Sequence, residues 1–152
     1  MGTTKGLQQI HAYLFGGLYD FAGQVREKSI SKGGYSFVYA QLLKATLKKI
    51  DAMPQSSFAE IIEKYAEMNK AHPFMEGNGR STRVCLDLIL KKELKQCIDW
   101  SKIRKEDYMN AMIISTVDPS VLEQLLKRAL TKKINDRELF MKGIDYSYYY
   151  EE

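Results

Sequence analysis

Apolar residues recur at spacings of three and four along most of the chain, with polar residues between them. This period places apolar side chains on one face of a helix and predicts amphipathic helices. The first helix has Leu7, Ile10, Leu14 and Leu18 as its expected buried face. The full pattern predicts an all-α protein with seven helices, within residues 7–18, 39–50, 57–71, 79–90, 100–112, 119–129 and 136–152.

Residues that start helices lie at the expected ends of several of these segments. Ser57 and Glu60 have the spacing of a capping box, in which two side chains satisfy main-chain N–H groups of the first turn. Asp118-Pro119 is expected to supply the N-cap and first residue of the next-to-last helix. Asn135 and Glu138 repeat the capping-box spacing before the last helix.

Residues 29–37 depart from the helical period. Ile30 is followed by the pair Gly33-Gly34, after which Tyr35 and Phe37 alternate with a serine. Two adjacent glycines suit the tight loop of a two-residue hairpin, and alternation is the period of a strand. We therefore expect one short β-hairpin here, and no other sheet.

Composition and charge narrow the class of protein. The chain has 152 residues, of which 45% are hydrophobic and 28% charged, as expected for a folded single domain spanning residues 1–152. The net charge of +4 is spread over both halves, which argues against nucleic-acid binding because that function usually needs a basic cluster. No apolar run exceeds four residues, so no membrane span is expected. The two cysteines, Cys85 and Cys97, form no disulfide pattern, and a cytoplasmic location is expected.

The segment 72–83 gathers groups that could bind a polyphosphate at a helix start. Gly77 and Gly79 let successive main-chain N–H groups turn toward one point, and the helix that follows adds its dipole. Asn78 could add a side-chain amide. Arg80 and Arg83 lie one turn apart and could donate to phosphate oxygens beyond the loop.

The same segment also carries a base and a carboxylate. Glu76 could hold a Mg²⁺ ion that bridges phosphate oxygens. His72 is a candidate general base for a hydroxyl that attacks phosphorus. Zinc chemistry is not expected, because the only other histidine, His11, is distant in sequence and no H-E-x-x-H pattern is present.

These residues resemble the Fic family, whose motif H-P-F-x-[D/E]-G-N-G-R-x-x-R is matched at every specified position from His72 to Arg83. The resemblance implies a compact helical Fic fold and Mg²⁺-dependent transfer of AMP from ATP to a hydroxyl side chain of a target protein. It implies that His72 is the base, that Glu76 binds the metal, and that ATP phosphates contact Gly77, Asn78, Gly79, Arg80 and Arg83. The segment 19–26 is similar to the family segment that precedes its flap, and residues 29–37 are similar to the flap that docks the target, with Ile30, Gly33, Gly34 and Tyr35 as its expected docking residues.

The C-terminal residues 147–151 resemble the inhibitory motif [S/T]-x-x-x-E-[G/N] of small Fic proteins, with Ser147 and Glu151 at the specified positions and Glu152 in place of glycine or asparagine. The resemblance implies that the last helix, 136–152, is autoinhibitory. A carboxylate at its end could pair with Arg83 and occupy the place of the γ-phosphate. A frayed acidic tail is the alternative. Self-modification of Tyr148, Tyr149 or Tyr150 is a second expectation for this segment.

Partners follow from the resemblance: ATP, Mg²⁺, and a target protein with an accessible hydroxyl, for which related bacterial Fic proteins suggest a type II topoisomerase subunit. The sequence leaves homo-oligomer formation open. Two other functions are alternatives, a binding module that keeps the nucleotide site without turnover and a purely structural helical bundle. The intact His72 and Glu76 argue against the binding module.

Overall fold

The computed structural model describes residues 2–151, apart from the side chains of Tyr148, Tyr149 and Glu151. This part of the chain contains seven α-helices, one 3₁₀ turn and four short strands. The predicted all-α bundle is therefore confirmed. The helices are α1 (Thr4–Phe15), α2 (Ala40–Asp51), α3 (Phe58–Ala71), α4 (Asn78–Leu94), α5 (Lys105–Ile114), α6 (Ser120–Lys127) and α7 (Arg137–Glu151), and the 3₁₀ turn η1 is Trp100–Lys102.

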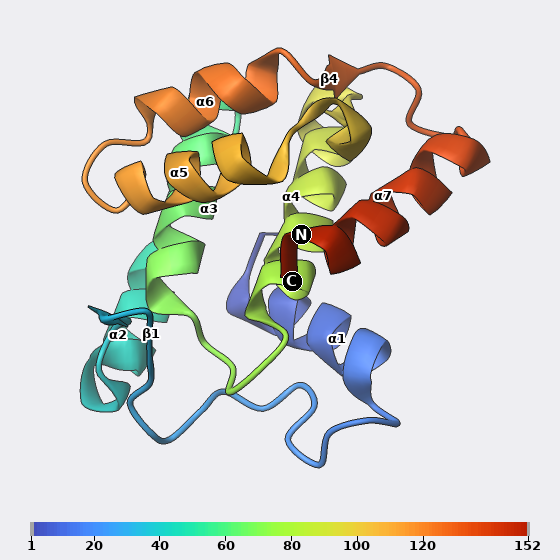
Figure 1. Cartoon of the computed structure of the whole chain (residues 1–152). Helices are drawn as coiled ribbons and strands as arrows, with labels where there is room; N and C mark the ends of the chain where they lie inside the picture. The colour runs from blue at the N-terminus through green and yellow to red at the C-terminus, as the bar shows by residue number, and fades with distance from the viewer. Residues whose placement is uncertain (1, 152) are drawn as a thin grey trace.

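Helix α4 runs through the middle of the molecule and packs against α1, α3 and α7 (Figure 1). Its residues Cys85, Leu86 and Leu90 are at most 1% exposed. A helix that is apolar around much of its circumference needs neighbours on several sides, and α4 has them. Because this helix begins at Asn78, the candidate phosphate-binding segment is attached directly to the core.

The caps of the helices are only partly as predicted. The capping box is confirmed, since Ser57 Oγ accepts from the Glu60 N–H and the Glu60 carboxylate accepts from the Ser57 N–H. Helix α6 begins one residue later than expected, with Pro119 at its N-cap. The predicted cap of α7 is wrong, because Asp136 rather than Asn135 accepts the N–H of Leu139, at 3.1 Å.

Two helix predictions need correction. The buried face of α1 consists of Leu7, Ile10, His11 and Phe15, whereas Leu14 is 41% exposed. The helix ends at Phe15, so Leu18 lies beyond it in the connection. The single helix expected over 100–112 is divided, because the chain forms η1 and then restarts as α5.

The predicted hairpin is confirmed. Strand β1 (Ser31–Lys32) pairs antiparallel with β2 (Tyr35–Ser36), with Ser31 opposite Ser36. Gly33 and Gly34 both have positive φ, of 58° and 80°, as the two-residue turn requires. It is not the only sheet, since β3 (Cys97–Ile98) pairs with β4 (Leu130–Thr131). Strands of two residues show no alternation, so the sequence gives no sign of this second sheet.

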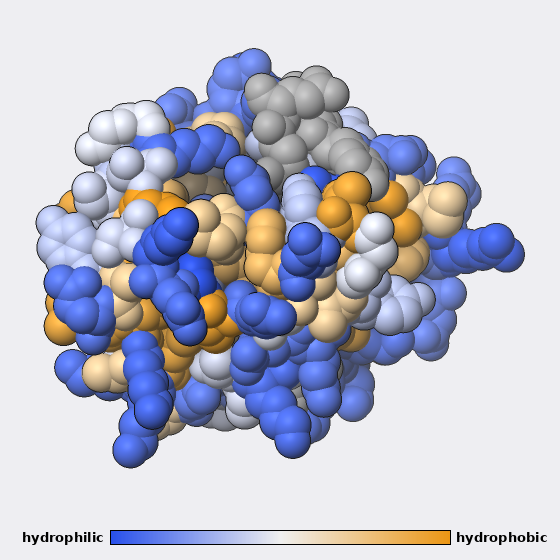
Figure 2. Space-filling view, turned by 90° about the horizontal axis from the view of Figure 1, so that it is seen from below, coloured by the Kyte–Doolittle hydropathy of each residue, from blue (hydrophilic) through white to orange (hydrophobic). Residues whose placement is uncertain are grey.

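A long connection leads from the end of α1 along the lower edge of the molecule to the hairpin (Figure 1). Large apolar side chains stay exposed near it, and the face viewed from below shows apolar residues surrounded by hydrophilic ones (Figure 2). Between residues 18 and 42, the exposed large apolar side chains are Leu18, Tyr35, Tyr39 and Leu42, which are 38–67% exposed. Within residues 2–151, no helix has the length and apolar character needed to cross a membrane.

Candidate active site

His72 lies at a sharp turn that ends α3. Its main chain is left-handed, with φ of 47°, and its N–H donates to the carbonyl of Met68 at 3.0 Å. Such a conformation is strained for a residue with a Cβ and costs on the order of 1–3 kcal/mol, so neighbouring contacts must hold it. The turn aims the chain from α3 toward the start of α4, with Pro73 as the next residue.

The imidazole ring of His72 is oriented from two sides. Its Nδ1 lies 3.1 Å from the carbonyl oxygen of Asn69, which can only accept, so Nδ1 carries the proton. In the neutral ring, Nε2 then bears the lone pair. The ring stacks on Phe37, which follows β2, with centroids 3.7 Å apart and planes at 8°. The structure therefore brings the candidate base against the residue that follows the hairpin.

Arg26 is a residue of this site that the sequence reasoning did not single out. It is 5% exposed, and its guanidinium donates to the main-chain carbonyls of Lys28, Val38, Ala71 and His72. Burial lowers the pKa of Arg26 from its ordinary value. An unusually buried arginine is visible only in the structure, because its partners lie up to 46 residues away in sequence.

Gly77 is the N-cap of α4 and has a main-chain conformation that only glycine adopts easily. Its φ is 80°, and a Cβ on this residue would lie 2.5 Å from Cε2 of Phe15. The glycine thus allows the loop to lie directly on α1. The following N–H groups of α4 form the end of a helix dipole, the arrangement that binds anions.

The side chain of Asn78 is buried and bonds the main chain of the loop. Both ends of its side-chain amide bond Phe74, since Oδ1 accepts from the Phe74 N–H at 2.8 Å and Nδ2 donates to the Phe74 carbonyl at 2.7 Å. The side chain thus closes the loop in this structure, and its contact with a phosphate stays a prediction. Gly79 lies in the first turn of α4, where its carbonyl accepts from the Thr82 hydroxyl at 3.1 Å.

A second histidine supports the loop from below. His11 is fully buried, stacks on Phe74 with centroids 3.9 Å apart, and its Nδ1 accepts from the Gly23 N–H at 2.9 Å. Its Nε2 therefore carries the proton and donates to the main-chain carbonyl of Glu76 at 2.8 Å. Burial lowers the pKa of His11, so the ring stays neutral in this position. The carboxylate of Glu76 is on the exposed side of the loop.

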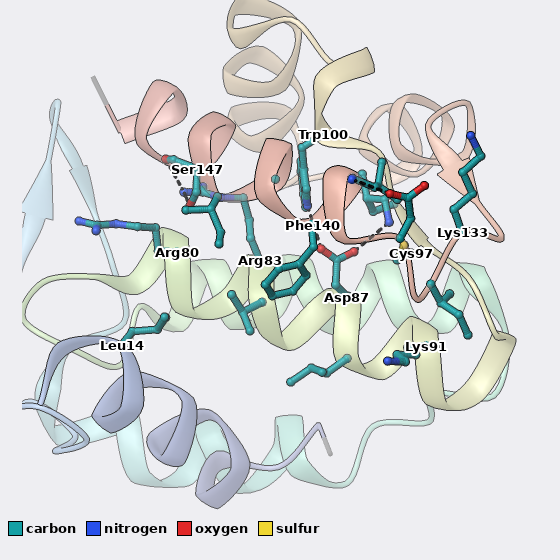
Figure 3. A pocket seen from close by; sticks show the side chains of 18 of the residues that line it. Leu14, Arg80, Arg83, Asp87, Lys91, Cys97, Trp100, Lys133, Phe140 and Ser147 are labelled. Atoms are coloured by element: carbon teal, nitrogen blue, oxygen red, sulfur yellow. Dashed lines mark hydrogen bonds between the residues drawn. The ribbon is translucent and has the colours of Figure 1, made fainter.

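The two arginines of the motif point toward different partners. The guanidinium carbon of Arg80 lies 5.0 Å from the centre of the Phe15 ring. Arg83 is 5% exposed, and its Nη2 donates to both the carbonyl and the hydroxyl of Ser147 in α7, each at 3.2 Å (Figure 3). The last helix thus contacts the arginine that the resemblance assigns to the γ-phosphate. The predicted inhibitory carboxylate, that of Glu151, lies outside the described residues.

Helix α7 is anchored near its end by Tyr150. This side chain is 4% exposed, and its hydroxyl lies 2.8 Å from the carbonyl of Trp100 and 2.6 Å from that of Ile103. While the helix is docked, the Tyr150 hydroxyl donates to these two carbonyls, and self-modification of Tyr150 after release of the helix stays a prediction. The side chains of Tyr148 and Tyr149 lie outside the described residues. Phe140, nearer the start of α7, is 68% exposed.

A cavity of about 240 Å³ lies between α1, α4 and α7 (Figure 3). Arg80 and Arg83 lie at one end, and Lys91 and Lys133 at the other. Along its wall, Asp87 accepts from the Ile98 N–H and from the indole N–H of Trp100, each at 2.9 Å, and burial raises the pKa of Asp87 to about 6. The described residues that line the cavity do not include His72 or Glu76, so the cavity lies behind the motif arginines rather than at the candidate base.

The hairpin is largely exposed, and Glu76 is the carboxylate of the motif that could hold a metal ion. Ile30 is half-buried, whereas Gly33, Gly34 and Tyr35 are exposed at the hairpin. Within the described part of the chain, no three acidic, histidine or cysteine side chains converge on one point. A single exposed carboxylate, that of Glu76, fits a Mg²⁺ ion that takes its other ligands from substrate phosphates and water.

The pattern of the Fic/DOC family matches residues 2–90, which contain both the hairpin and the segment 72–83. This chain belongs to the Fic/DOC family. It is similar to the protein adenylyltransferase VbhT of Bartonella schoenbuchensis, with 28% identity over a region that covers 91% of this chain and 32% of VbhT. The chain spans 32% to 61% of the lengths of three curated relatives that it matches.

Solved structures show the same fold. The BepC protein of Bartonella tribocorum with bound AMPPNP superposes with a TM-score of 0.74 and 20% identity, covering 85% of this chain and 74% of that one. The N-terminal Fic domain of a VirB-translocated Bep effector protein of Bartonella quintana, with bound ADP, has a TM-score of 0.74 and 22% identity, covering 93% of this chain and 78% of that one. The predicted Fic fold is confirmed.

Proposed function

We propose that this Fic-family chain is a protein adenylyltransferase that transfers AMP from ATP to a hydroxyl side chain of a target protein. The target oxygen bonds to the α-phosphorus of ATP, the bond from that phosphorus to the bridging oxygen breaks, and pyrophosphate leaves. Nε2 of His72 takes the hydroxyl proton. The observation that carries the proposal is the orientation of His72, whose Nδ1 proton is held by Asn69 and whose ring lies against Phe37.

The phosphates bind at the start of α4 in this proposal. The N–H groups that follow Gly77 and the helix dipole favour a polyanion, and Arg80 lies in the same first turn of α4. A Mg²⁺ ion held by Glu76 would neutralise phosphate charge and help pyrophosphate to leave. The name of VbhT, and the AMPPNP and ADP in the two solved structures, support ATP as the substrate.

The target protein docks at the hairpin in this proposal. Strands β1 and β2 are exposed, and their edge can pair with an extended segment through main-chain hydrogen bonds. Such pairing places a target hydroxyl over His72 with little dependence on the target sequence. The exposed apolar side chains Tyr35 and Tyr39 add a surface that a target can cover. A cytoplasmic location is part of the proposal, and the free thiols Cys85 and Cys97 are consistent with it.

Autoinhibition by α7 is the regulatory part of the proposal. The contact of Ser147 with Arg83 and the anchoring of Tyr150 support it. A carboxylate at Glu151 would then compete with the γ-phosphate for Arg83, so that ATP binds without its α-phosphate in line with the target hydroxyl. Replacing Glu151 by glycine should raise activity, whereas a catalytic role for this carboxylate predicts a fall.

The experiment that tests the proposal follows the label of ATP into protein. Glu151→Gly should incorporate radiolabel from α-labelled ATP and none from γ-labelled ATP, with less incorporation by the wild-type chain. Adding His72→Ala should abolish incorporation, while Val117→Ala, at a side chain that is 92% exposed, serves as the matched control. Label from γ-labelled ATP, or equal activity with and without His72, would refute AMP transfer by this mechanism.

A further inference from the structure

Arg26 joins two parts of the molecule that lie far apart in sequence. On one side, its Nε donates to the carbonyl of His72 at 2.7 Å and its Nη2 to that of Ala71 at 2.9 Å. On the other side, Nη1 donates to Lys28 at 2.7 Å and Nη2 to Val38 at 2.5 Å. Lys28 precedes β1 and Val38 follows β2, so one side chain holds both ends of the hairpin to the turn that bears His72.

Main-chain hydrogen bonds extend the same connection. The N–H of Arg26 donates to the carbonyl of Pro73 at 2.8 Å, and the N–H of Val38 donates to that of Lys70 at 3.2 Å. These contacts place Phe37, the residue before Val38, where its ring stacks on His72. The position of the hairpin and the position of the imidazole are therefore determined together.

A buried guanidinium is suited to this task. It presents five N–H donors in a rigid plane, and these donors point in different directions. Several main-chain carbonyls around the group can therefore accept hydrogen bonds from it at the same time. In the described part of the chain, no carboxylate pairs with Arg26, so its charge is compensated by carbonyl dipoles alone. A lysine keeps the charge but offers only a point donor, which cannot reach all four carbonyls at once.

We propose that Arg26 is a positioning residue, which sets the distance between the imidazole of His72 and a target hydroxyl held at the hairpin. The inference rests on the proposed AMP transfer. Arg26 touches neither ATP nor target in this scheme. Its loss should therefore lower the turnover of target protein and leave the binding of ATP, at the start of α4, nearly unchanged.

The test uses Arg26→Lys in the Glu151→Gly chain, with Arg104→Lys, at an exposed arginine, as the matched control. We expect kcat for a protein target to fall by about tenfold or more, since small displacements of a reacting group have effects of this size. The dissociation constant for ATP should stay within about twofold of that of the control. An unchanged kcat would overturn the inference, and so would an equal loss of ATP affinity, which would indicate general damage.

A spectroscopic arm separates this inference from the proposed function. The chain contains two histidines, so ¹⁵N-histidine labelling gives one reporter at the site, His72, and one internal control, His11. Arg26→Lys should shift the His72 ring signals as stacking on Phe37 is lost, while those of His11 stay in place. If the Glu151→Gly parent transfers no AMP, this arm still decides the positioning role, and an unmoved His72 signal overturns it.

Hydrogen exchange of the unsubstituted protein covers the case in which Arg26→Lys does not fold. The amides of Val38 and His72, which are fixed by contacts of the same network, should exchange in one shared opening event. Separate opening, with the Val38 amide exchanging while that of His72 stays protected, would overturn the inference.

Discussion

The two histidines of the chain are fixed in opposite tautomers by their neighbours. In His72, Nδ1 donates to the carbonyl of Asn69, which leaves Nε2 as the basic nitrogen. In His11, Nδ1 accepts from Gly23 and Nε2 donates to the carbonyl of Glu76. The same side chain therefore has two uses within one site, as the proposed base and as a neutral support beneath the proposed metal-binding loop.

Replacing His11 by phenylalanine should test this support. The ring would still stack on Phe74, but the Gly23 N–H and the Glu76 carbonyl would lose their partner, at a cost of about 1–3 kcal/mol. Burial in the folded state lowers the pKa of His11. The contribution of His11 to the free energy of unfolding is therefore fully present above about pH 6.5 and decreases as the pH falls below it.

Thermal unfolding between pH 5 and pH 7.5 measures both effects. His11→Phe should be less stable than wild type at pH 7.5, and its stability should fall less as the pH is lowered. An equal dependence on pH in the two proteins would contradict a neutral, buried His11.

Gly77 is the second residue whose substitution has a clear expected outcome. Alanine at this position would combine a strained φ with a Cβ 2.5 Å from the Phe15 ring, at a cost on the order of 1–3 kcal/mol. AMP transfer should fall with it, because the loop can no longer lie on α1. Gly17→Ala is the control, since no atom lies within 4 Å of the added Cβ. Equal melting temperatures for the two variants would contradict this explanation.

Among the elements, α7 is attached to the rest of the molecule mainly near its end. Tyr150 packs against Tyr108, with ring centroids 4.7 Å apart, and donates to η1 and to the residue after it. Ser147 contacts Arg83 one turn earlier, whereas Phe140 remains largely exposed. The helix is therefore held where the proposed inhibition takes place.

Tyr150→Phe should weaken this attachment without removing its ring contacts. The carbonyls of Trp100 and Ile103 would lose their donor, which destabilises the docked position of α7 by about 1–2 kcal/mol. If α7 is autoinhibitory, incorporation of label from α-labelled ATP should rise by roughly fivefold or more, to a level below that of Glu151→Gly. Tyr13→Phe, at an exposed tyrosine, controls for the loss of a hydroxyl. Unchanged or reduced incorporation would argue against inhibition by α7.

The elements also show which predictions a sequence can support. The capping box of Ser57 and Glu60 was predictable because its two partners are neighbours in the chain. The inward face of α1 was predictable only in part. Leu7 and Ile10 follow the apolar period, whereas His11 and Phe15 are buried against distant residues that include Phe74 and Gly77. Arg26 and His11 contact this segment across 46 and 65 residues, separations that no local spacing records.

At the scale of the whole molecule, Asp87 links the central helix to the C-terminal half. Its carboxylate accepts from the N–H of Ile98 in β3 and from the indole N–H of Trp100 in η1. The main-chain carbonyl of Trp100 in turn accepts from the Tyr150 hydroxyl. Burial raises the pKa of Asp87 from 3.8 to about 6, so between about pH 4 and pH 6 the folded protein holds a proton that the unfolded chain has released. Stability is therefore highest below about pH 4 for this group and decreases as pH rises toward 6.

Asp87→Asn should remove this contribution to the dependence of stability on pH. The wild-type contribution amounts to at most about 3 kcal/mol between pH 4 and pH 6. Denaturant unfolding at several pH values should show a flatter profile for Asp87→Asn than for wild type, with Asp107→Asn, at an exposed carboxylate, as the control. Parallel profiles for wild type and Asp87→Asn would contradict the raised pKa.

The way in which Arg26 holds the hairpin has a practical consequence for protein engineering. Its acceptors at Lys28 and Val38 are main-chain carbonyls, which every amino acid carries. Between them, Ser29 and Phe37 also contribute side chains, since Ser29 Oγ accepts from the Ala40 N–H at 3.0 Å and the Phe37 ring stacks on His72. The segment 30–36 can therefore be exchanged as a unit of fixed length. Under the proposed function, segments from other proteins or libraries randomised over 30–36 should redirect AMP transfer to new targets, while Phe37 and the imidazole behind it stay in place.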